Sequence, residues 1–450
     1  MESISTEFAR FARKLRFEDL GPEVVAHAKQ LILDLVGVAL AGYSMDFPRM
    51  TVDYISELGG RSEATILRQR KKAPVLLAAF ANGVCSHALD MDYGHRYGAV
   101  HPASAIIPAA IAAAEWQKRD GKDLITAVVA GYEVLLRISR AINPSHLLRG
   151  FHTTGTVGPF GAAIAAARLM DLGHEETVSA LGLAGLHGAG LLEILHDEAM
   201  VKPIHPGKAA ESGVLSAILA QKGARGPVSI FEGQKGFLVA MADKADPGSL
   251  LEGLGKRFEC LGGYFKLHAA CRHIHAIVDA ALEICKKNAL SAKEIEQIKI
   301  GTYPVAIQFC GNIVHPETVS AAKFSIPCSV AMAITFGDLF NDKYVEKNIE
   351  NEEIKALASR IKASSQEEWA RAYPDQRGAT VRIKTCSGQS YSQSVGLAKG
   401  EPENPATLED LKEKFRTNAA QVLSPKRTEN LMESIMDLDH SRVSDMTRYF

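Results

Sequence analysis

The sequence predicts a mainly α-helical protein in which a smaller α+β lid domain is inserted before the last helices. Three observations support this fold class. Apolar residues recur at helical spacing from residue 7 to about 223, strand-like alternation starts only after residue 262, and helical spacing returns after a Pro-rich linker. The expected domains are residues 1–262 for the first part of the helical domain, 263–399 for the lid, and 400–450 for the helical return.

The first 223 residues carry the helical prediction. Apolar residues are spaced as on one face of a helix, and many residues are Ala or Gly, which let neighbouring helices approach closely. The clearest predicted helices span residues 24–41, 74–87, 102–117, 123–142 and 156–170. No repeat period is visible, so a tight bundle is expected rather than a repeat array. His101-Pro102 and His205-Pro206 are typical of helix starts because proline is tolerated in the first turn.

The lid is predicted from the change of pattern after residue 262. Strands are expected at residues 294–302, 379–384 and 390–397, the last two joined by a hairpin, and helices at 273–288, 325–336 and 352–359. Residues 400–405 form a polar linker, after which residues 408–423 and 429–438 return to helical spacing. A lid inserted into a helical domain predicts an active cleft between the two.

Composition excludes several classes of protein. Lys and Arg total 51 against 52 Asp and Glu, which argues against proteins that bind nucleic acid or membranes by charge. None of the seven cysteines forms a Cys-x-x-Cys pair, as is typical of reduced thiols. The N-terminus lacks the apolar core of a signal peptide, and the apolar run at 31–41 is interrupted by Asp34. A cytoplasmic protein is therefore expected.

No cofactor or metal motif accompanies the 15 histidines, which are the unusual feature of the composition. The chain has no dinucleotide fingerprint, no phosphate-binding loop and no His-Glu-x-x-His pattern. His268, His273 and His275 do not have the spacing of a zinc site. We therefore expect neither a cofactor nor a metal, and a small molecule as the binding partner.

Polar chemistry concentrates in four segments, and two of them combine histidine with carboxylates or hydroxyls. In residues 86–104 an apolar helix runs into Asp90 and Asp92, and the next helix begins at His101. These residues either end one helix and cap the next, or form a carboxylate–imidazole pair in which the carboxylate raises the basicity of the histidine. In residues 149–158, His152 lies in a Gly- and Thr-rich run that is either a simple N-cap or a donor set for a bound oxygen.

The other two segments are cationic. Residues 202–213 place Lys202, His205 and Lys208 at the start of an Ala-rich helix, where the lysines either are solvated or face a cavity. In residues 264–275 five cationic or imidazole side chains lie close to Cys271; they are Lys266, His268, Arg272, His273 and His275. In a chain of net charge −1 such a cluster is typical of a site that binds several carboxylates.

Together the four segments supply acid–base groups and cations without a cofactor. This combination favours removal of a proton or of CO₂ next to a carboxylate, with Lys and Arg neutralising the developing charge and histidine moving the proton. Elimination of water, decarboxylation and epimerisation share this beginning, and the spacing of the residues does not separate them.

Several blocks of sequence resemble those of the MmgE/PrpD family and follow its order between residues 20 and 420. The blocks are LDMDYGH, HPASAIIPAA, GFHTTGTVG, KPIHPGKAAESG, FKLHAACRHIHAIVDAA, AKFSIPCSVAMA, RGATVRI and KGEPENP. The family includes 2-methylcitrate dehydratase, cis-aconitate decarboxylase and iminodisuccinate epimerase. The resemblance implies a large helical domain with an α+β lid, a homodimer, a polycarboxylate substrate and catalysis without a metal or iron–sulfur cluster.

The resemblance also implies the site residues. His101 is the expected base and Asp90 its orienting partner, while His152 and Lys266 are expected near the leaving group and Lys202 on a substrate carboxylate. Further residues expected to bind substrate are His205, Lys208, His268, Cys271, Arg272 and His273.

The expected function is that of a cofactor-independent hydro-lyase similar to 2-methylcitrate dehydratase. Cys271 stands where the decarboxylase branch has a histidine, so decarboxylation is less expected. Cys328 stands where many members have a tyrosine, so the substrate is expected to differ from 2-methylcitrate. The alternatives are an epimerase or a decarboxylase of a related acid, and a non-catalytic protein that binds carboxylates.

Overall fold

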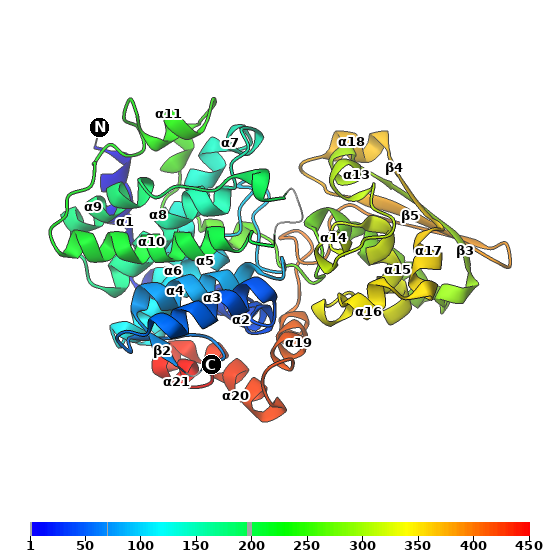
Figure 1. Cartoon of the computed structure of the whole chain (residues 1–450). Coiled ribbons are helices and arrows are strands. Elements are labelled where there is room, and N and C mark those ends of the chain that lie inside the picture. Colours follow the sequence, from blue (N-terminus) through cyan, green and yellow to red (C-terminus); the bar gives the residue numbers. More distant parts are fainter. Residues whose placement is uncertain (1, 70, 196–199) are drawn as a thin grey trace. The chain divides into compact units, whose positions relative to one another are not determined.

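The computed structural model describes residues 2–69, 71–195 and 200–450 (Figure 1). The chain divides into two compact units. Residues Met1–Tyr264 and Leu411–Phe450 form the helical unit, and residues Phe265–Asp410 form the α+β unit. The described residues are mainly α-helical, with a two-stranded hairpin and one four-stranded sheet, and the mainly helical fold class is the one that the sequence predicts.

The helical unit consists of helices and one short hairpin. The helices are α1 (Ile4–Lys14), α2 (Pro22–Gly42), α3 (Asp46–Leu58), α4 (Val75–His87), α5 (Ala103–Trp116), α6 (Gly121–Ile142), α7 (Ser145–Leu148), α8 (Thr153–Leu169), α9 (His174–Gly185), α10 (Ile204–Gln221), α11 (Phe237–Met241), α19 (Leu408–Ala419), α20 (Pro425–Met436) and α21 (Val443–Thr447). The hairpin pairs β1 (Ala64–Thr65) with β2 (Lys72–Ala73). The five long helices predicted from the sequence are therefore confirmed, within a few residues at each end.

The core of the helical unit is the buried helix α8, which packs against α5, α6, α9 and α10, while α10 also packs on α4 (Figure 1). Small residues allow these close approaches. A Cβ atom on Gly83 of α4 would lie 2.8 Å from Cα of Gly207 in α10, and one on Gly213 would lie 2.4 Å from Cβ of Ala162 in α8. Since real Cβ atoms do not approach that closely, glycine is required where these helices cross. The Ala- and Gly-rich composition thus produces the tight bundle.

Helix α2 is long and apolar enough to cross a membrane, by length and composition alone. Most of it is buried inside the helical unit, however, which is typical of the core helix of a compact domain. Asp34, near its middle, is 2% exposed and forms an ion pair with Lys414 of α19.

The α+β unit consists of one four-stranded sheet and short helices. The strands are β3 (Ile295–Thr302), β4 (Ile361–Ser365), β5 (Ala379–Thr385) and β6 (Ser390–Val395). The helices are α12 (His275–Asn288), α13 (Pro304–Cys310), α14 (Val319–Ala322), α15 (Ile326–Phe336), α16 (Glu346–Ile349), α17 (Glu352–Ala358) and α18 (Glu367–Ala372).

The sheet has the strand order β4-β3-β5-β6. β4 runs parallel to β3, while β5 is antiparallel to both β3 and β6. Ile298 of β3 is the partner of Ile361 on one side and of Ile383 on the other, and all three side chains are buried. Helix α12 packs against β5 and β6, and α15 packs against α12 and α17. Strands β3, β5 and β6 match the predicted strands, whereas β4 is not among them.

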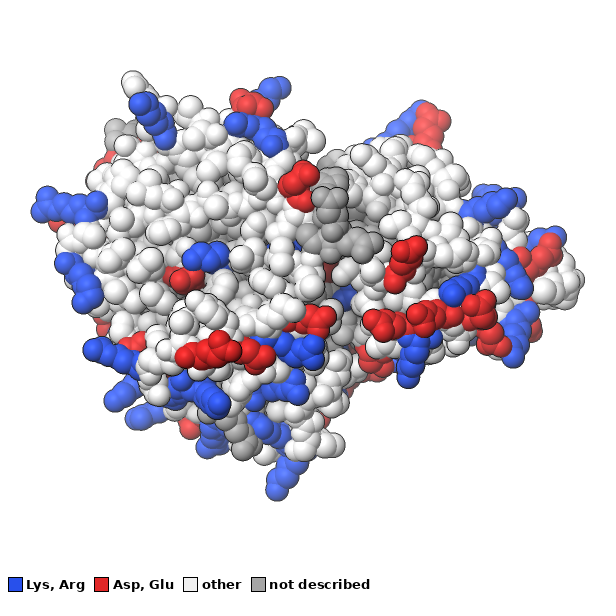
Figure 2. Space-filling view, in the orientation of Figure 1, with Lys and Arg blue, Asp and Glu red and all other residues white. Residues whose placement is uncertain are grey.

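Charged side chains of both signs are mixed on the surface. On the face shown in Figure 2, basic and acidic residues are interspersed over both units. This mixing is in keeping with the net charge of −1.

Candidate active site

The turn that follows α4 carries two aspartates. α4 ends at His87, and Asp90 adopts a left-handed backbone conformation with φ 53°. A residue other than glycine rarely takes this conformation unless its surroundings hold it there. The turn sends the two carboxylates to different partners: Asp90 Oδ1 accepts a hydrogen bond from Lys202 Nζ at 2.9 Å, whereas Asp92 contacts His87.

Asp92 is fully buried between two imidazoles. His87 Nδ1 lies 2.9 Å from both carboxylate oxygens of Asp92. His101 Nδ1 lies 3.5 Å from Asp92 Oδ2 and 3.3 Å from the backbone carbonyl oxygen of the same residue. Burial disfavours the charged form of Asp92, but the two imidazoles outweigh burial and hold the pKa of Asp92 well below its usual range. The carboxylate is therefore ionised at neutral pH.

The partners of His101 determine which ring nitrogen carries the hydrogen. A carbonyl oxygen and an ionised carboxylate can only accept hydrogen bonds, so Nδ1 of His101 is the protonated nitrogen. Nε2 then holds the lone pair, which is the form that a general base requires. The backbone is fixed as well, because the N–H of His101 donates to Thr154 Oγ1, in the first turn of α8, at 3.0 Å.

His87 is the more deeply buried of the two imidazoles beside Asp92. Its Nδ1 donates to the Asp92 carboxylate, and its Nε2 has no hydrogen-bond partner among the described residues. Burial lowers the pKa of His87 to about 4, despite the neighbouring carboxylate. His87 is therefore neutral at pH 7 and acts as a hydrogen-bond donor that holds Asp92 in place.

Two further histidines meet next to this pair. His152 precedes α8, His205 lies in the first turn of α10, and their Nδ1 atoms are 2.9 Å apart, so one ring donates to the other. The ring of His152 also stacks on that of His87, with centroids 5.8 Å apart. Burial, followed by the charge of Lys202, lowers the pKa of both His152 and His205. Both rings are therefore neutral hydrogen-bonding groups at pH 7.

The two lysines of this region have different surroundings. Lys202 pairs with Asp90, and the two side chains are 22% and 15% exposed. Lys208 is 56% exposed and donates to Glu211 at 2.6 Å, near the surface of α10. We call the group of His87, His101, His152 and His205, with Asp92, the histidine cluster. Lys202 is the cation beside this cluster, whereas Lys208, which the sequence also selects, forms its ion pair outside it.

These neutral histidines lead us to expect that acid destabilises the fold. The pKa of His87 is about 4 in the folded chain and 6.5 ordinarily, so between these values the unfolded chain binds a proton that the folded chain does not. The free energy of unfolding should therefore fall as the pH falls from 6.5 to 4, by about 3 kcal/mol from His87 alone. Burial also lowers the pKa of His27 to about 4, which adds a contribution of the same sign.

Glu133 opposes this trend, because burial raises its pKa to about 7 and its contribution to stability grows as the pH falls. Burial also raises the pKa of Asp34 and Asp123, but it lowers the pKa of six histidines, so we expect the net effect of acid to be a loss. Urea midpoints between pH 7 and 4.5 measure it. His87→Gln should make the pH dependence shallower, while His440→Gln, at an exposed position, should leave it unchanged. A stability that is constant over this range would contradict the expectation.

In the α+β unit the fourth segment forms a polar cluster of its own. His268 Nε2 lies 2.7 Å from Asp279 Oδ1, and Lys266 is 2% exposed. Arg272 donates to the buried Glu401 at 2.7 Å, a partner 129 residues away in sequence. The charge of Arg272 is thus balanced within the unit by a carboxylate that its own segment of sequence does not contain.

The other two residues selected from this segment also have partners in the α+β unit. His273 Nδ1 lies 2.5 Å from the hydroxyl of Tyr303, and the N–H of Cys271 donates to the Lys323 carbonyl at 2.9 Å. The expectation that the residues of this segment bind substrate remains a prediction.

One predicted pairing differs from the contacts in the structure. The family resemblance implies that Asp90 orients His101, but the carboxylate beside His101 is that of Asp92, and Asp90 pairs with Lys202. Two residues of the cluster, His87 and Asp92, are missing from the predicted set. Their signal in the sequence is their place at the end of an apolar helix, five residues apart, immediately before the loop that leads to His101.

The same three residues have the spacing of a possible metal site. One donor atom from each of His87, Asp92 and His101 lies within 4.8 Å of the others. With the hydrogens on the two nitrogens that face Asp92, the same three side chains form a carboxylate–imidazole group. The absence of a metal remains a prediction, and the acid–base arrangement is the one developed below.

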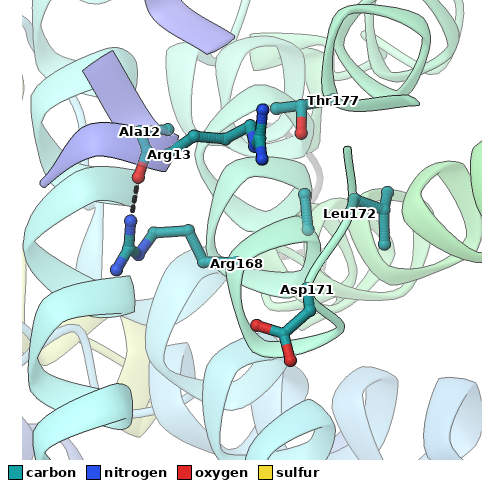
Figure 3. Close-up of a pocket in the computed structure, with 7 residues that line it drawn as sticks. Ala12, Arg13, Arg168, Asp171, Leu172 and Thr177 are labelled. Carbon is teal, nitrogen blue, oxygen red and sulfur yellow. Dashed lines mark hydrogen bonds between the residues drawn. The ribbon is translucent and has the colours of Figure 1, made fainter. Parts of the chain in front are cut away.

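A hollow of about 190 Å³ on the helical unit lies elsewhere (Figure 3). It is lined by Ala12, Arg13, Ala167, Arg168, Asp171, Leu172 and Thr177. In it Arg168 donates to the backbone carbonyl of Ala12. None of the lining residues belongs to the histidine cluster, and none is an imidazole, so we do not place the chemistry there.

Family comparison covers nearly the whole chain. The MmgE/PrpD N-terminal domain matches residues 6–249, and the MmgE/PrpD C-terminal domain matches residues 268–439. The chain belongs to the MmgE/PrpD family. The family resemblance seen in the sequence blocks is thereby confirmed.

Several curated proteins are similar to this MmgE/PrpD chain along its length. The cis-aconitate decarboxylase of Aspergillus terreus is 26% identical over 99% of this chain and 94% of its own. The human cis-aconitate decarboxylase is 25% identical over 98% of this chain and 92% of its own. The cis-aconitate decarboxylase-like protein oryM of Aspergillus oryzae is 24% identical over 98% of this chain and 95% of its own.

Proposed function

We propose that the protein is a lyase that eliminates water from a di- or tricarboxylic acid. The observation that carries this proposal is the buried, ionised Asp92 beside His101, because it leaves the lone pair of His101 at Nε2. Elimination of water from a hydroxy acid begins when a base removes a proton next to a carboxylate. A histidine in this tautomer, with a carboxylate to stabilise its cationic form, is suited to that step.

The neighbouring groups fit the other requirements of the reaction. Lys202 would bind a substrate carboxylate and neutralise the charge that develops on it as the proton leaves. The imidazolium of His101 formed in that step would return its proton to the departing hydroxyl group, which leaves as water. His152 would donate a hydrogen bond to the same oxygen, with His205 fixing the orientation of its ring. The contribution expected of Lys266, the homodimer and the cytoplasmic location remain predictions.

Decarboxylation is the second candidate, because the similar curated proteins are named as cis-aconitate decarboxylases. Both reactions are lyase reactions on polycarboxylates, and the family membership supports that broader class. Elimination is the first choice because of a residue in the α+β unit. Cys271, where the decarboxylase branch has a histidine, favours this choice.

A panel of acids tests the proposal. The purified protein is incubated with hydroxy, unsaturated and amino di- and tricarboxylic acids in buffer that contains EDTA, and the products are identified by mass. Loss of the mass of one water molecule from a hydroxy acid supports elimination. Loss of CO₂ supports the second candidate. A repeat in deuterated water detects an epimerase, which would place deuterium in recovered substrate without net loss of mass. Binding without turnover of any acid would contradict all three enzymatic functions.

A further inference from the structure

Asp34 of α2 and Lys414 of α19 form a buried ion pair in the helical unit. Lys414 Nζ donates to Asp34 Oδ1 at 2.5 Å, and the two side chains are 1% exposed for Lys414 and 0% for Asp34. The pair joins residues 380 positions apart in the sequence. Neither residue belongs to the histidine cluster, and neither has a part in the reaction proposed above.

Docking of α19 onto α2 does not require this pair. Phe415, next to Lys414, packs so closely on α2 that a Cβ atom at Gly37 would lie 2.9 Å from its ring. Leu411 and Phe415 are both buried, so apolar contacts already hold the helix in place. A buried ion pair is, moreover, a poor device for stability, because desolvation of two charges offsets most of their attraction and an apolar pair of similar volume serves as well.

A second bond from the same ammonium leads to the active site. Lys414 Nζ also donates to the backbone carbonyl of Met91 at 2.8 Å. Met91 stands between Asp90 and Asp92, and its carbonyl belongs to the peptide group that precedes Asp92. Since Asp90 is in the left-handed region, this turn needs an external contact to hold its shape. Lys414 supplies one that no apolar side chain could supply.

Electrostatic coupling agrees with this short path. Burial raises the pKa of Asp34, Lys414 opposes the rise, and the charge of Asp92 adds to it. The charges of the buried pair and of Asp92 are therefore near enough to influence each other.

We propose that Asp34 and Lys414 are positioning residues of the active site: Asp34 orients the Lys414 ammonium, which clamps the Met91 carbonyl and thereby aims Asp92 at His101. The proposal rests on the proposed function, in which His101 is the base. Lys414 of α19, in the C-terminal part of the helical unit, would thus affect the acid–base step although it does not belong to the histidine cluster.

The decisive variant is the apolar double replacement Asp34→Leu with Lys414→Met. It removes both charges of the pair together but leaves the Met91 carbonyl without the ammonium, so the chain should still fold, with a melting temperature several degrees below that of the wild type. The expected result is a fall in kcat of about 10- to 100-fold with little change in KM, because the substrate-binding groups stay and only the aim of the base partner is lost. The matched control is Lys29→Met with Asp439→Leu, which removes the 2.8 Å ion pair between the same helix α2 and the same C-terminal return, and should leave kcat within twofold.

A second measurement does not depend on turnover. In protein labelled with ¹⁵N-histidine, the ring nitrogens of His101 report which one carries the hydrogen. In the double variant of Asp34 and Lys414 the two nitrogen shifts should move toward each other, since the Nδ1–H form loses its fixed partner; in the control they should not. Wild-type kcat and unchanged shifts in the double variant would overturn the proposal. If the wild type turns over no acid, the proposed function fails, and the nitrogen shifts still test the positioning role.

Discussion

Replacing His101 by alanine is expected to lower kcat by about 10³-fold. The variant keeps the buried Asp92 carboxylate and the cation Lys202, so substrate binding and KM should change little. The variant loses the lone pair on Nε2 of His101, to which the proposed reaction transfers the substrate proton. Steady-state kinetics on the substrate found in the acid panel gives the number.

The fold should survive this change. The side chain of His101 is 16% exposed, and the hydrogen bond that fixes its position in the loop is made by its backbone N–H, which alanine retains. His146→Gln is a suitable control, since His146 is also buried and hydrogen-bonded, to the Met241 carbonyl and to Thr156. A His101→Ala variant with near-normal kcat would exclude His101 as the base.

Much of the fold could be predicted from the sequence because its signals are local. The long helices of the helical unit and α12, α15 and α17 of the other unit lie where helical spacing places them, and Pro102 and Pro206 stand just before or within first helical turns. β5 and β6 form a hairpin whose alternation is visible without knowledge of the rest of the chain. In each of these helices and strands the spacing of apolar residues within the element itself is enough to predict it.

The elements that the sequence does not predict depend on distant partners. β4 has only five residues, Ile361-Lys-Ala-Ser-Ser365, of which one is strongly apolar, and it exists because it pairs in parallel with β3, which lies far earlier in the chain. β1 and β2 are two residues each and pair only with each other. Short edge strands of this kind are set by tertiary contacts rather than by their own composition.

In the candidate site, too, some features could be predicted from the sequence and others depend on the three-dimensional structure. Clusters of His, Lys and Asp in a neutral chain could be found by inspection, and His101, His152, His205 and Lys202 do lie in one group, of which His152 is buried and the other three are partly buried. Which of two aspartates faces the base could not be found, because the left-handed conformation of Asp90 reverses the chain between them. The sequence Asp-x-Asp carries no sign of that reversal.

Long-range ion pairs are the other part that sequence reasoning misses. Arg272 looks like a substrate-binding cation until Glu401 is found beside it, and Lys414 looks like an ordinary helix-surface lysine until Asp34 is found. A buried charge needs a partner, but the partner's identity is a property of the fold. Predicted cationic sites are therefore overestimated wherever acidic residues from remote segments are packed against them.

Replacing Asp92 by asparagine is expected to lower kcat by about 10³- to 10⁴-fold while changing the volume of the core little. The amide has no charge to stabilise the imidazolium form of His101, and its NH₂ group can donate to Nδ1. That bond would move the hydrogen of His101 to Nε2, where it blocks the base. Kinetics should be measured together with the melting temperature, because Asp92 also accepts from His87 and part of the loss in stability is separate from the loss in rate.

The Asp90→Asn variant tests whether Asp92, and not Asp90, is the carboxylate that orients His101. The family resemblance implies the orienting role for Asp90, whereas in the structure Asp92 lies beside His101 and Asp90 is the partner of Lys202. In the Asp90→Asn variant Lys202 loses its charged partner, so mainly KM should change, by about tenfold. His101 should stay in the form that acts as a base. If Asp90→Asn instead abolishes turnover while Asp92→Asn retains it, Asp90 is the carboxylate that works with His101 during turnover, and the arrangement seen in the structure must change when substrate binds.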